Sequence, residues 1–527
     1  MFTALKQRYR FRIIIPAYPA FNIYSNFADK TTALGPVSIA SVVNEMEGWD
    51  VEVIDENNLR RFGPRSGIRG ADHEFLQSQR PADIVGLYGG LTSTIPRLYE
   101  IACFYKSKSK DIVTFAGGQH FVEETIAEAL NSHVDYVIIG EGEETVKELF
   151  KVLREGSDIN SVKGIAYLKE GKVVFTKERE PVTAFEKFPL PDFSLVRYAK
   201  IKVYPVERIR GCGMNCEFCT VKGRPRCGSP ERLLEQISFM VETQGARHFF
   251  IVDDLFGQQR DETLRFCNML KEYQKNIRKG LDTNVQIRLD KAKDTDLLRA
   301  MREAGINMVA IGYESPIEEE LKAMKKNIKP EEMVFHTKIF RKFGFLVHGM
   351  FIFGYPLEKG VDFHLSTEER VKRYRQFIRK SKIDTFQVLL PVPLPGTQLR
   401  ERLKRENRIY PLEHVGWEYY DGNFPLFEPD EPMTAEENLH AVRRLMKGFY
   451  QFKYMFKIGL NVFSFPALIF FLHNIRLGWR RWYRPWRNDL IRFGGWFVVK
   501  GWAKEFKKDS FQAKLQKARD HMVKEKN

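Results

Sequence analysis

The most constraining feature of this 527-residue sequence is a group of three cysteines at the spacing C-x3-C-x2-C. Cys212, Cys216 and Cys219 follow the strand-like segment Tyr204–Ile209, and a glycine on each side of the first cysteine lets the loop turn tightly. Thiolates at this spacing can surround an iron–sulfur cube, and three of them leave one iron without a protein ligand. A structural zinc site with Cys227 as its fourth ligand is the alternative, although zinc sites more often use C-x2-C pairs.

Short apolar runs and helical patterns alternate through the first 165 residues. The apolar runs predict five strands, at residues Phe11–Pro16, Val51–Ile54, Ile84–Leu87, Ile112–Phe115 and Tyr136–Ile139. Strand–helix alternation implies an α/β fold with a doubly wound, Rossmann-like (flavodoxin-like) parallel sheet, whose ligands bind beyond the carboxyl ends of the strands. Those ends are rich in glycine, which lets a ligand come close to the backbone.

A second alternation begins near residue 204 and predicts a partial (β/α)6 barrel of the TIM type, with its chemistry at the carboxyl ends of the strands. Its later strands are expected at His248–Val252, Val285–Ile287, Met308–Ile311, Leu346–Phe353 and Thr385–Leu390. Five segments follow from the whole pattern. We predict a sheet domain at residues 1–165, a linker at 166–203, the barrel at 204–400, a C-terminal subdomain at 401–457 and a helical, basic tail at 458–527.

The tail differs from the rest of the chain in charge and aromatic content. From residue 447 onward there are 18 Lys and Arg against five Asp and Glu, which accounts for most of the net charge of +16. The apolar run Ile458–Leu472 is shorter than the roughly 20 residues of a spanning helix, and Trp and Arg alternate after it. This combination favours either a membrane interface or a subdomain that packs its aromatic side chains on the barrel.

Residues 204–400 resemble the core of the radical S-adenosylmethionine (SAM) superfamily. The resemblance rests on the cysteine triad, on the aromatic residue before its last cysteine, and on short motifs after three later strands. It implies that the triad holds a [4Fe-4S] cluster whose open iron binds SAM. The other SAM contacts that it implies are Phe218, Asp253, Asp254, Arg288, Gly312 and Glu314. The second motif is Asp-Asp here, where the family commonly has Gly-Gly-Glu.

The first domain resembles the cobalamin-binding (B12) domain that precedes this core in many members, including the anaerobic magnesium-protoporphyrin ester cyclase and hopanoid methylase group. The implied cobalamin contacts are Gly89, Thr92, Ser93, Gly117, Gly118, Gln119, His120, Gly140, Glu141, Gly142 and Glu143. The sequence lacks the Asp-x-His-x-x-Gly motif that supplies a lower axial histidine in methionine-synthase-type proteins. His120 is therefore either a cobalt ligand or a histidine that lines the pocket or is hydrogen-bonded. A domain that keeps this fold without binding cobalamin is the alternative.

The resemblance implies an enzyme that cleaves SAM and forms a 5′-deoxyadenosyl radical, with a flavodoxin- or ferredoxin-type electron donor. With cobalamin, the expected reaction is methylation of an unactivated carbon on a hydrophobic, lipid- or isoprenoid-like substrate. Two alternatives stay open: a radical oxidative cyclase or rearrangement enzyme that does not bind cobalamin, and a non-enzymatic protein that binds cobalamin or lipid.

Nucleic acid is not an expected partner. Methylthiotransferases of this superfamily, which modify nucleic acids, carry a second cysteine triad in the N-terminal domain, where this chain has only Cys103. The N-terminus has no apolar signal segment, and six cysteines are too few for a disulfide framework in a chain of this length. We therefore expect a cytoplasmic protein, with its tail at the inner membrane face.

Overall fold

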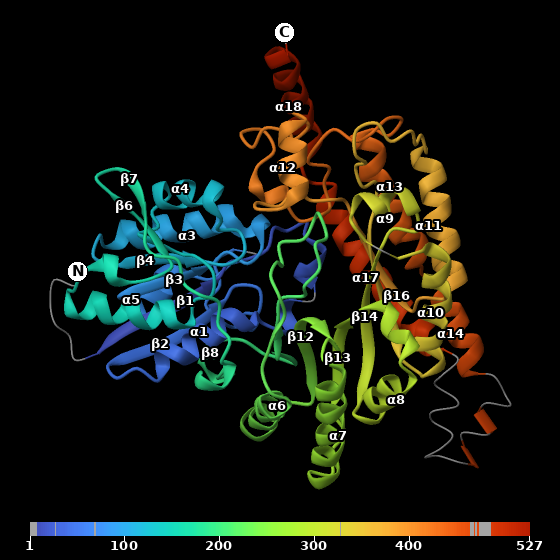
Figure 1. The fold of residues 1–527 in the computed structure, drawn as a ribbon, viewed down its shortest axis with the longest axis horizontal. Coiled ribbons are helices and arrows are strands. Elements are labelled where there is room, and N and C mark those ends of the chain that lie inside the picture. Colours follow the sequence, from blue (N-terminus) through green and yellow to red (C-terminus); the bar gives the residue numbers. More distant parts are fainter. Residues whose placement is uncertain are drawn as a thin grey trace.

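The computed structural model describes residues 8–26, 28–67, 70–326, 328–463, 468–469, 472–473 and 486–526. Two α/β domains lie side by side, one blue to teal and the other green to yellow in Figure 1. The C-terminal helices, orange to red, cover the far side of the second domain and end in a helix that projects from the molecule.

The first domain is built on a sheet of eight strands in the order β7-β6-β5-β4-β3-β1-β2-β8. Strands β1 to β5 pair in parallel, which confirms the predicted doubly wound sheet. Helices flank the sheet, so the central strands are buried almost throughout. The strands are β1 Tyr9–Ile15, β2 Trp49–Asp55, β3 Ile84–Tyr88, β4 Val113–Gly117, β5 Tyr136–Ile138, β6 Ile165–Lys169, β7 Lys172–Phe175 and β8 Val196–Arg197. The main helices are α1 Leu34–Asn44, α2 His73–Gln79, α3 Ile95–Lys108, α4 Glu123–Asn131 and α5 Glu143–Glu155.

The segment predicted as a linker, residues 166–203, contributes to both edges of this sheet. Strands β6 and β7 form an antiparallel hairpin across Glu170-Gly171, and β6 pairs with β5. At the opposite edge β8 pairs in parallel with β2. The residues predicted as a linker thus extend the first sheet at both of its edges.

The second domain contains a curved parallel sheet in the order β16-β15-β14-β13-β12-β9, which confirms the predicted partial barrel. Each neighbouring pair is parallel. Its strands are β9 Val203–Val206, β12 His248–Phe256, β13 Asp282–Ile287, β14 Ile306–Glu314, β15 Leu346–Ile352 and β16 Thr385–Leu389. Its helices are α6 Pro230–Gln244, α7 Arg260–Asn276, α8 Thr295–Glu303, α9 Glu318–Ala323, α10 Pro330–Lys342 and α11 Thr367–Ser381.

Among the described residues of the C-terminal part, the helices are α12 Gln398–Arg405, α13 Ala435–Phe449, α14 Tyr454–Val462, α17 Arg487–Phe506 and α18 Phe511–Lys526. Near its start, helix α17 contacts the barrel, where Arg492 donates a hydrogen bond to the carbonyl of Ile383, 2.9 Å away. Near its end, the buried Phe506 stacks on Phe424 of the C-terminal subdomain, with 4.6 Å between the ring centroids. Helix α14 lies beside α17 with much of its apolar surface exposed.

Much of the apolar and Trp/Arg-rich part of the tail lies outside the described residues. These include 464–467, 470–471 and 474–485, and with them Trp479, Trp482 and Tyr483. Among the helices that the structure describes, none combines the length and the apolar character that crossing a membrane requires.

Candidate active site

The cysteine triad lies on a loop that is closed at its base by a short two-stranded ribbon. Strands β10 (Ile209–Arg210) and β11 (Arg226–Cys227) pair antiparallel, and the loop between them contains all three cysteines. Gly211 has φ +85°, and a Cβ there would come within 2.8 Å of the Arg224 carbonyl oxygen. Only glycine fits at this point, which confirms that Gly211 lets the loop turn tightly before the first cysteine.

The three thiols of the triad lie close enough to interact electrostatically with one another. Thiolates are the soft ligands that iron–sulfur clusters take. Cys227, the fourth ligand that a zinc site would need, lies outside the loop, where it pairs with Ile209 in the ribbon at its base. The three cysteines of the loop therefore form a donor set suited to an iron–sulfur cluster.

Burial controls the protonation of two of these thiols. It raises the pKa of both Cys216 and Cys219, and the neighbouring thiols act in the same direction. Protonated thiols do not bind metal, so each must lose its proton when iron binds.

Two carboxylates after strand β12 hold the start of the cluster loop. Asp253 Oδ1 accepts hydrogen bonds from the backbone N–H groups of Arg208 (2.6 Å) and Ile209 (2.9 Å), and Asp254 Oδ2 accepts one from Gly211 (2.6 Å). Burial raises the pKa of Asp253 to about 7. These aspartates are predicted SAM contacts, and in the structure they also fix the loop immediately before Cys212.

The next two strands send side chains to the same loop. After β13, Arg288 Nη1 lies 2.9 Å from the sulfur of Met214, inside the cluster loop, while its Nη2 is paired with Asp290 at 2.9 Å. At the end of β14, Glu314 is paired with Lys326, and both interact electrostatically with Cys216.

Two other predicted SAM residues lie near the loop. Gly312 lies in β14, and a Cβ there would come within 2.4 Å of the Glu314 carboxylate, which would have to move aside. Phe218 presents its ring edge-on to Tyr355, with 6.2 Å between the ring centroids. The predicted SAM residues are thus brought to one edge of the barrel, around the loop that holds the cysteines.

The sequence did not indicate that Glu217, a residue of the cluster loop itself, anchors this loop to the rest of the barrel. Glu217, between the second and third cysteines, is buried and accepts hydrogen bonds from Arg402 Nε (2.7 Å), Arg402 Nη2 (2.9 Å) and the Tyr355 hydroxyl (2.7 Å). The Glu217 N–H also donates to the Met324 carbonyl at 3.2 Å. Arg402 lies in a helix rich in charge, where nothing in the sequence distinguishes it from its neighbours.

The glycine-rich edge of the first sheet faces the cluster loop. A cavity of about 260 Å³ lies there, and Glu207 and Arg210 of the second domain line it together with first-domain residues. The predicted cobalamin contacts that line it are Gly117, Gly118, Gly140, Glu141, Gly142 and Glu143. A second cavity of the same volume adjoins it and shares Tyr88. We call this glycine-rich hollow between the domains the cradle; it lies at the edge of the sheet where doubly wound folds bind their ligands.

Arg210 connects the two sites directly. It precedes the cluster loop and pairs with Glu141 at 3.1 Å and with Glu143 at 2.7 Å, both from the first domain. Glu141 is also paired with Arg226 at 2.7 Å, at the other end of the loop. The two glutamates, predicted as cobalamin contacts, therefore hold the sheet edge against the loop from both sides.

Two of the predicted glycines are required because neighbouring loops come too close there to leave room for a side chain. Gly118 has φ +129°, and a Cβ there would lie 2.6 Å from the backbone of Gly89. A Cβ at Gly89 would in turn lie 2.4 Å from the ring of Phe121. Gly140, in contrast, has φ +77°, and a Cβ there would meet no atom within 4 Å, so this glycine leaves the cradle open.

The side chain of His120 lies away from the cavity, in a buried contact. The side chain is 1% exposed, its Nδ1 lies 3.3 Å from the Thr92 hydroxyl, and its ring meets Trp417 edge-on at 4.9 Å. Burial lowers the pKa of His120 to about 3, so the imidazole is neutral. It does not line the cavity described above. It is a hydrogen-bonded histidine at the contact between the first domain and the C-terminal subdomain.

The other three predicted residues divide between two places. Thr92 and Ser93 are buried in the same contact as His120, which η8 (Trp417–Tyr419) covers. The side chain of Gln119 instead reaches the cluster loop, where it accepts a hydrogen bond from Thr220 at 3.3 Å.

Comparison with known proteins agrees with this two-part organisation. Residues 23–150 match the family model of the B12 binding domain, and residues 206–369 match that of the Radical SAM superfamily. An uncharacterised methyltransferase of Pyrococcus horikoshii is 28% identical, over 79% of this chain and 87% of its own length. The hopanoid C-2 methylase of Rhodopseudomonas palustris is 30% identical, over 45% of this chain and 44% of its own length.

A similar fold occurs in a solved structure. The cobalamin-dependent SAM radical enzyme OxsB, with aqua-cobalamin and SAM bound, superposes with a TM-score of 0.64 and 16% identity, over 98% of this chain and 84% of that one. The anaerobic magnesium-protoporphyrin IX monomethyl ester cyclase of Rubrivivax gelatinosus is 24% identical, over 69% of this chain and 65% of its own. The predicted combination of a B12-binding domain with a radical SAM core is confirmed.

Proposed function

We propose that this protein, a radical SAM enzyme whose cofactors are a [4Fe-4S] cluster, SAM and cobalamin, methylates an unactivated carbon of a hydrophobic, lipid- or isoprenoid-like substrate. When bound, the cluster and SAM supply a radical that abstracts hydrogen, and cobalamin supplies the methyl group. The observation that carries the proposal is the placement of the glycine-rich cradle against the cluster loop, with Arg210 between them.

The chain's own share of this reaction is to place the reacting groups and keep them together. Cys212, Cys216 and Cys219 would hold the cluster, with Asp253 and Asp254 fixing the loop before it. The SAM contacts would be Phe218, Asp253, Asp254, Arg288, Gly312 and Glu314, and cobalamin would lie along the glycine-rich edge. Groups held in a fixed orientation react as parts of one molecule, which removes much of the entropic barrier.

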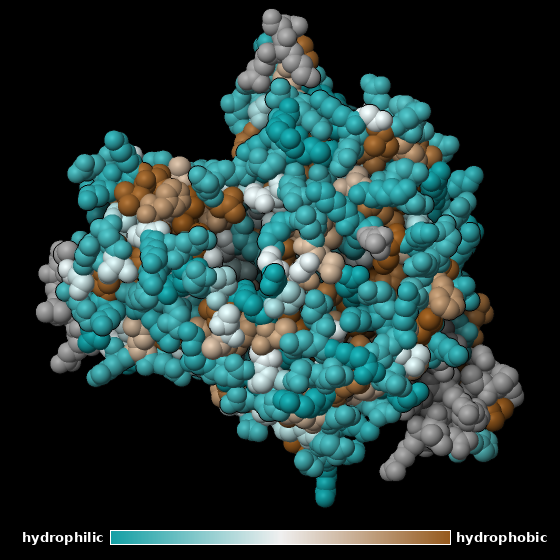
Figure 2. Space-filling view, in the orientation of Figure 1, coloured by the Kyte–Doolittle hydropathy of each residue, from teal (hydrophilic) through white to brown (hydrophobic). Residues whose placement is uncertain are grey.

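An exposed apolar surface on the C-terminal helices supports the hydrophobic substrate. On α14, Phe456, Leu460 and Phe463 are 61%, 76% and 79% exposed, and Phe497 of α17 is 57% exposed. Figure 2 shows hydrophobic residues on the surface where α14 lies, beside residues left grey. Apolar patches of this kind mark interaction surfaces.

The charges around this patch favour a membrane as the source of the substrate. Lys447, Lys500, Lys504 and Lys507 line a hollow between α13 and α17, and Lys453 and Lys457 lie on or next to α14. Lysines beside an apolar patch attract anionic lipid headgroups, each contributing about 1 kcal/mol near the membrane surface. We therefore include peripheral binding to an anionic membrane in the proposal.

The reaction is tested with enzyme reconstituted anaerobically with iron, sulfide and hydroxocobalamin, a reduced flavodoxin, and SAM labelled in its methyl group. Incubation with a total cell extract that includes the membranes should give 5′-deoxyadenosine and label in the lipid fraction. The variant in which all three triad cysteines are replaced by alanine should give neither. Label that enters only polar metabolites would overturn the hydrophobic substrate. 5′-Deoxyadenosine without any labelled product would instead favour an oxidative cyclase.

Membrane binding is tested separately by flotation of the full chain with vesicles of phosphatidylglycerol. We expect the wild type to float at low salt and a double variant, Phe456→Glu with Phe463→Glu, to remain in the dense fraction. Phe62→Glu is the matched control, because Phe62 is 94% exposed in the first domain, away from α14. Equal flotation of the three proteins would refute this part of the proposal.

A further inference from the structure

We propose that Glu413, His414 and His521 form a binding site for a divalent transition-metal ion of the zinc class, and that the ion fastens helix α18 to the C-terminal subdomain. The three side chains converge from two parts of the chain that are about 100 residues apart. They lie in a different group from the triad cysteines and take no part in the proposed reaction.

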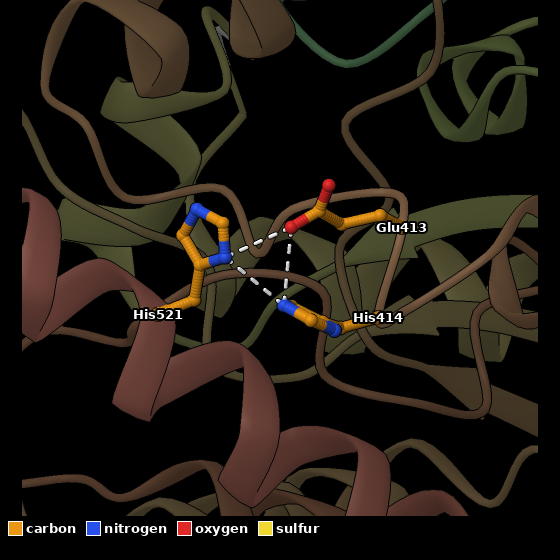
Figure 3. A group of neighbouring side chains, drawn as sticks. All are labelled: Glu413, His414 and His521. Atoms are coloured by element: carbon orange, nitrogen blue, oxygen red, sulfur yellow. Dashed lines mark hydrogen bonds and ion pairs between the residues drawn. The ribbon is translucent and has the colours of Figure 1, made fainter.

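The ligand atoms of these residues meet at one point (Figure 3). Glu413 Oε1 lies 3.2 Å from His414 Nε2 and 2.8 Å from His521 Nδ1, and the two imidazole nitrogens are 3.1 Å apart. A tetrahedral zinc ion with bonds of 2.0–2.1 Å separates its ligand atoms by about 3.4 Å. Small rotations of the side chains would bring all three atoms to that separation.

The three side chains provide a donor set that suits a metal ion. Each imidazole can turn a nitrogen lone pair toward the common point when its hydrogen is on the other ring nitrogen, and the carboxylate supplies a third lone pair. Imidazole with carboxylate is a donor set that zinc uses.

The position of the site explains what the ion would do. Glu413 and His414 lie in a turn after α12, where the His414 N–H donates to the Pro411 carbonyl at 3.1 Å. His521 lies in the last part of α18, beyond the buried Phe511, Leu515 and Ala518. Figure 1 shows α18 projecting from the molecule with the C-terminus at its tip. An ion at His521 would extend the contact by one more helical turn.

Other contacts already align α18 with this turn. Lys514 pairs with Glu418 at 2.9 Å, and Arg519 pairs with Glu428 at 2.7 Å and with Glu436 at 2.6 Å. The helix therefore presents His521 to the turn without the metal, which lowers the entropic cost of forming the site. The three ligand side chains are only partly buried, so water can reach the remaining position on the ion.

The test uses the full chain with its cluster reconstituted, so that the triad cysteines are occupied by iron. Isothermal titration with Zn²⁺ should give one site per chain, and zinc retained after dialysis should equal one ion in elemental analysis. His414→Ala and His521→Ala should each weaken Zn²⁺ binding by at least about 100-fold, since losing a ligand costs more than losing a supporting residue. His248→Ala, which removes another histidine paired with a carboxylate, should bind zinc normally.

Hydrogen exchange supplies a readout of the fastening itself. Zinc should slow amide exchange over residues 515–524 at least about tenfold in the wild type. Glu413→Gln keeps the size of this exposed side chain, so its helix should dock normally, bind zinc more weakly and show little slowing. Equal zinc binding by the double variant His414→Ala/His521→Ala would overturn the site. Zinc binding without slower exchange in α18 would overturn the fastening role.

Discussion

The pair of Glu217 and Arg402, which anchors the cluster loop, gives the sharpest prediction for mutagenesis. Arg402→Met removes both hydrogen bonds from Arg402 to the buried Glu217 carboxylate, at 2.7 and 2.9 Å, and keeps a similar side-chain length. It also removes the bonds from Arg402 to the Leu357 and Pro356 carbonyls, at 2.9 and 3.0 Å. Of the hydrogen-bond donors that the described residues supply to the carboxylate, the Tyr355 hydroxyl, at 2.7 Å, would remain.

The magnitude follows from the burial of the pair. Removing one partner from a buried ion pair leaves an unpaired charge and typically costs about 3–5 kcal/mol. Glu217 and Arg402 are both largely buried, so the full range applies. Because Glu217 lies between two cluster cysteines, the same energy should be lost from local opening of the loop. That corresponds to an increase in opening of about 150- to 5,000-fold.

The assay measures the loop and the barrel independently. Iron release from the reconstituted cluster to an excess of a coloured chelator reports loop opening, and guanidinium unfolding under anaerobic conditions reports the domain. The control is Arg260→Met, which breaks an exposed pair with Asp294 on the outside of the barrel. That change should cost less than about 1 kcal/mol and leave iron release unchanged.

A double-mutant cycle isolates the interaction. Glu217→Gln removes the charge, so Arg402→Met should be less damaging in that background, with a coupling energy above about 1 kcal/mol. If Arg402→Met changes the free energy of unfolding by less than about 1 kcal/mol and iron release keeps its wild-type rate, the anchor has been misidentified.

Three further predictions concern the first domain. Gly118→Ala should destabilise it by at least about 2 kcal/mol in calorimetry and weaken hydroxocobalamin binding, because the new Cβ meets backbone at 2.6 Å. Gly140→Ala, at an open position, is the control and should cost about 1 kcal/mol. The pKa of His120 is about 3 in the folded state, below its unfolded value of about 6.5. Above pH 6.5 the imidazole is neutral in both states, so protonation of His120 does not destabilise the fold there. Stability should fall by up to about 1.4 kcal/mol per unit as pH drops from 6.5 toward 3, and His120→Gln should remove one proton from this dependence in denaturation curves. Arg210→Met breaks the pairs with Glu141 and Glu143, which join the two domains. Limited proteolysis should therefore cut residues 176–202, which connect the domains, at least several times faster. An unchanged rate would contradict the interdomain role.

Local patterns in the sequence determined the two sheets and the identity of the loop. The cysteine spacing is a property of eight consecutive residues, and the strand–helix alternation repeats over windows of similar length. The strands that they predict are present. These patterns can be recognised without knowing the fold, because each one depends only on residues that are close together in the sequence.

The partners of these elements were decided only by the tertiary structure. Sequence periodicity tells which face of an element is buried, but not which distant side chain it meets. Glu217 and Arg402 are 185 residues apart, and Arg210 and Glu143 are 67 apart. The same is true of His414 and His521, whose rings meet only because α18 folds back onto the turn after α12. Contacts of this kind depend on the packing of whole elements, and no local pattern of residues encodes them.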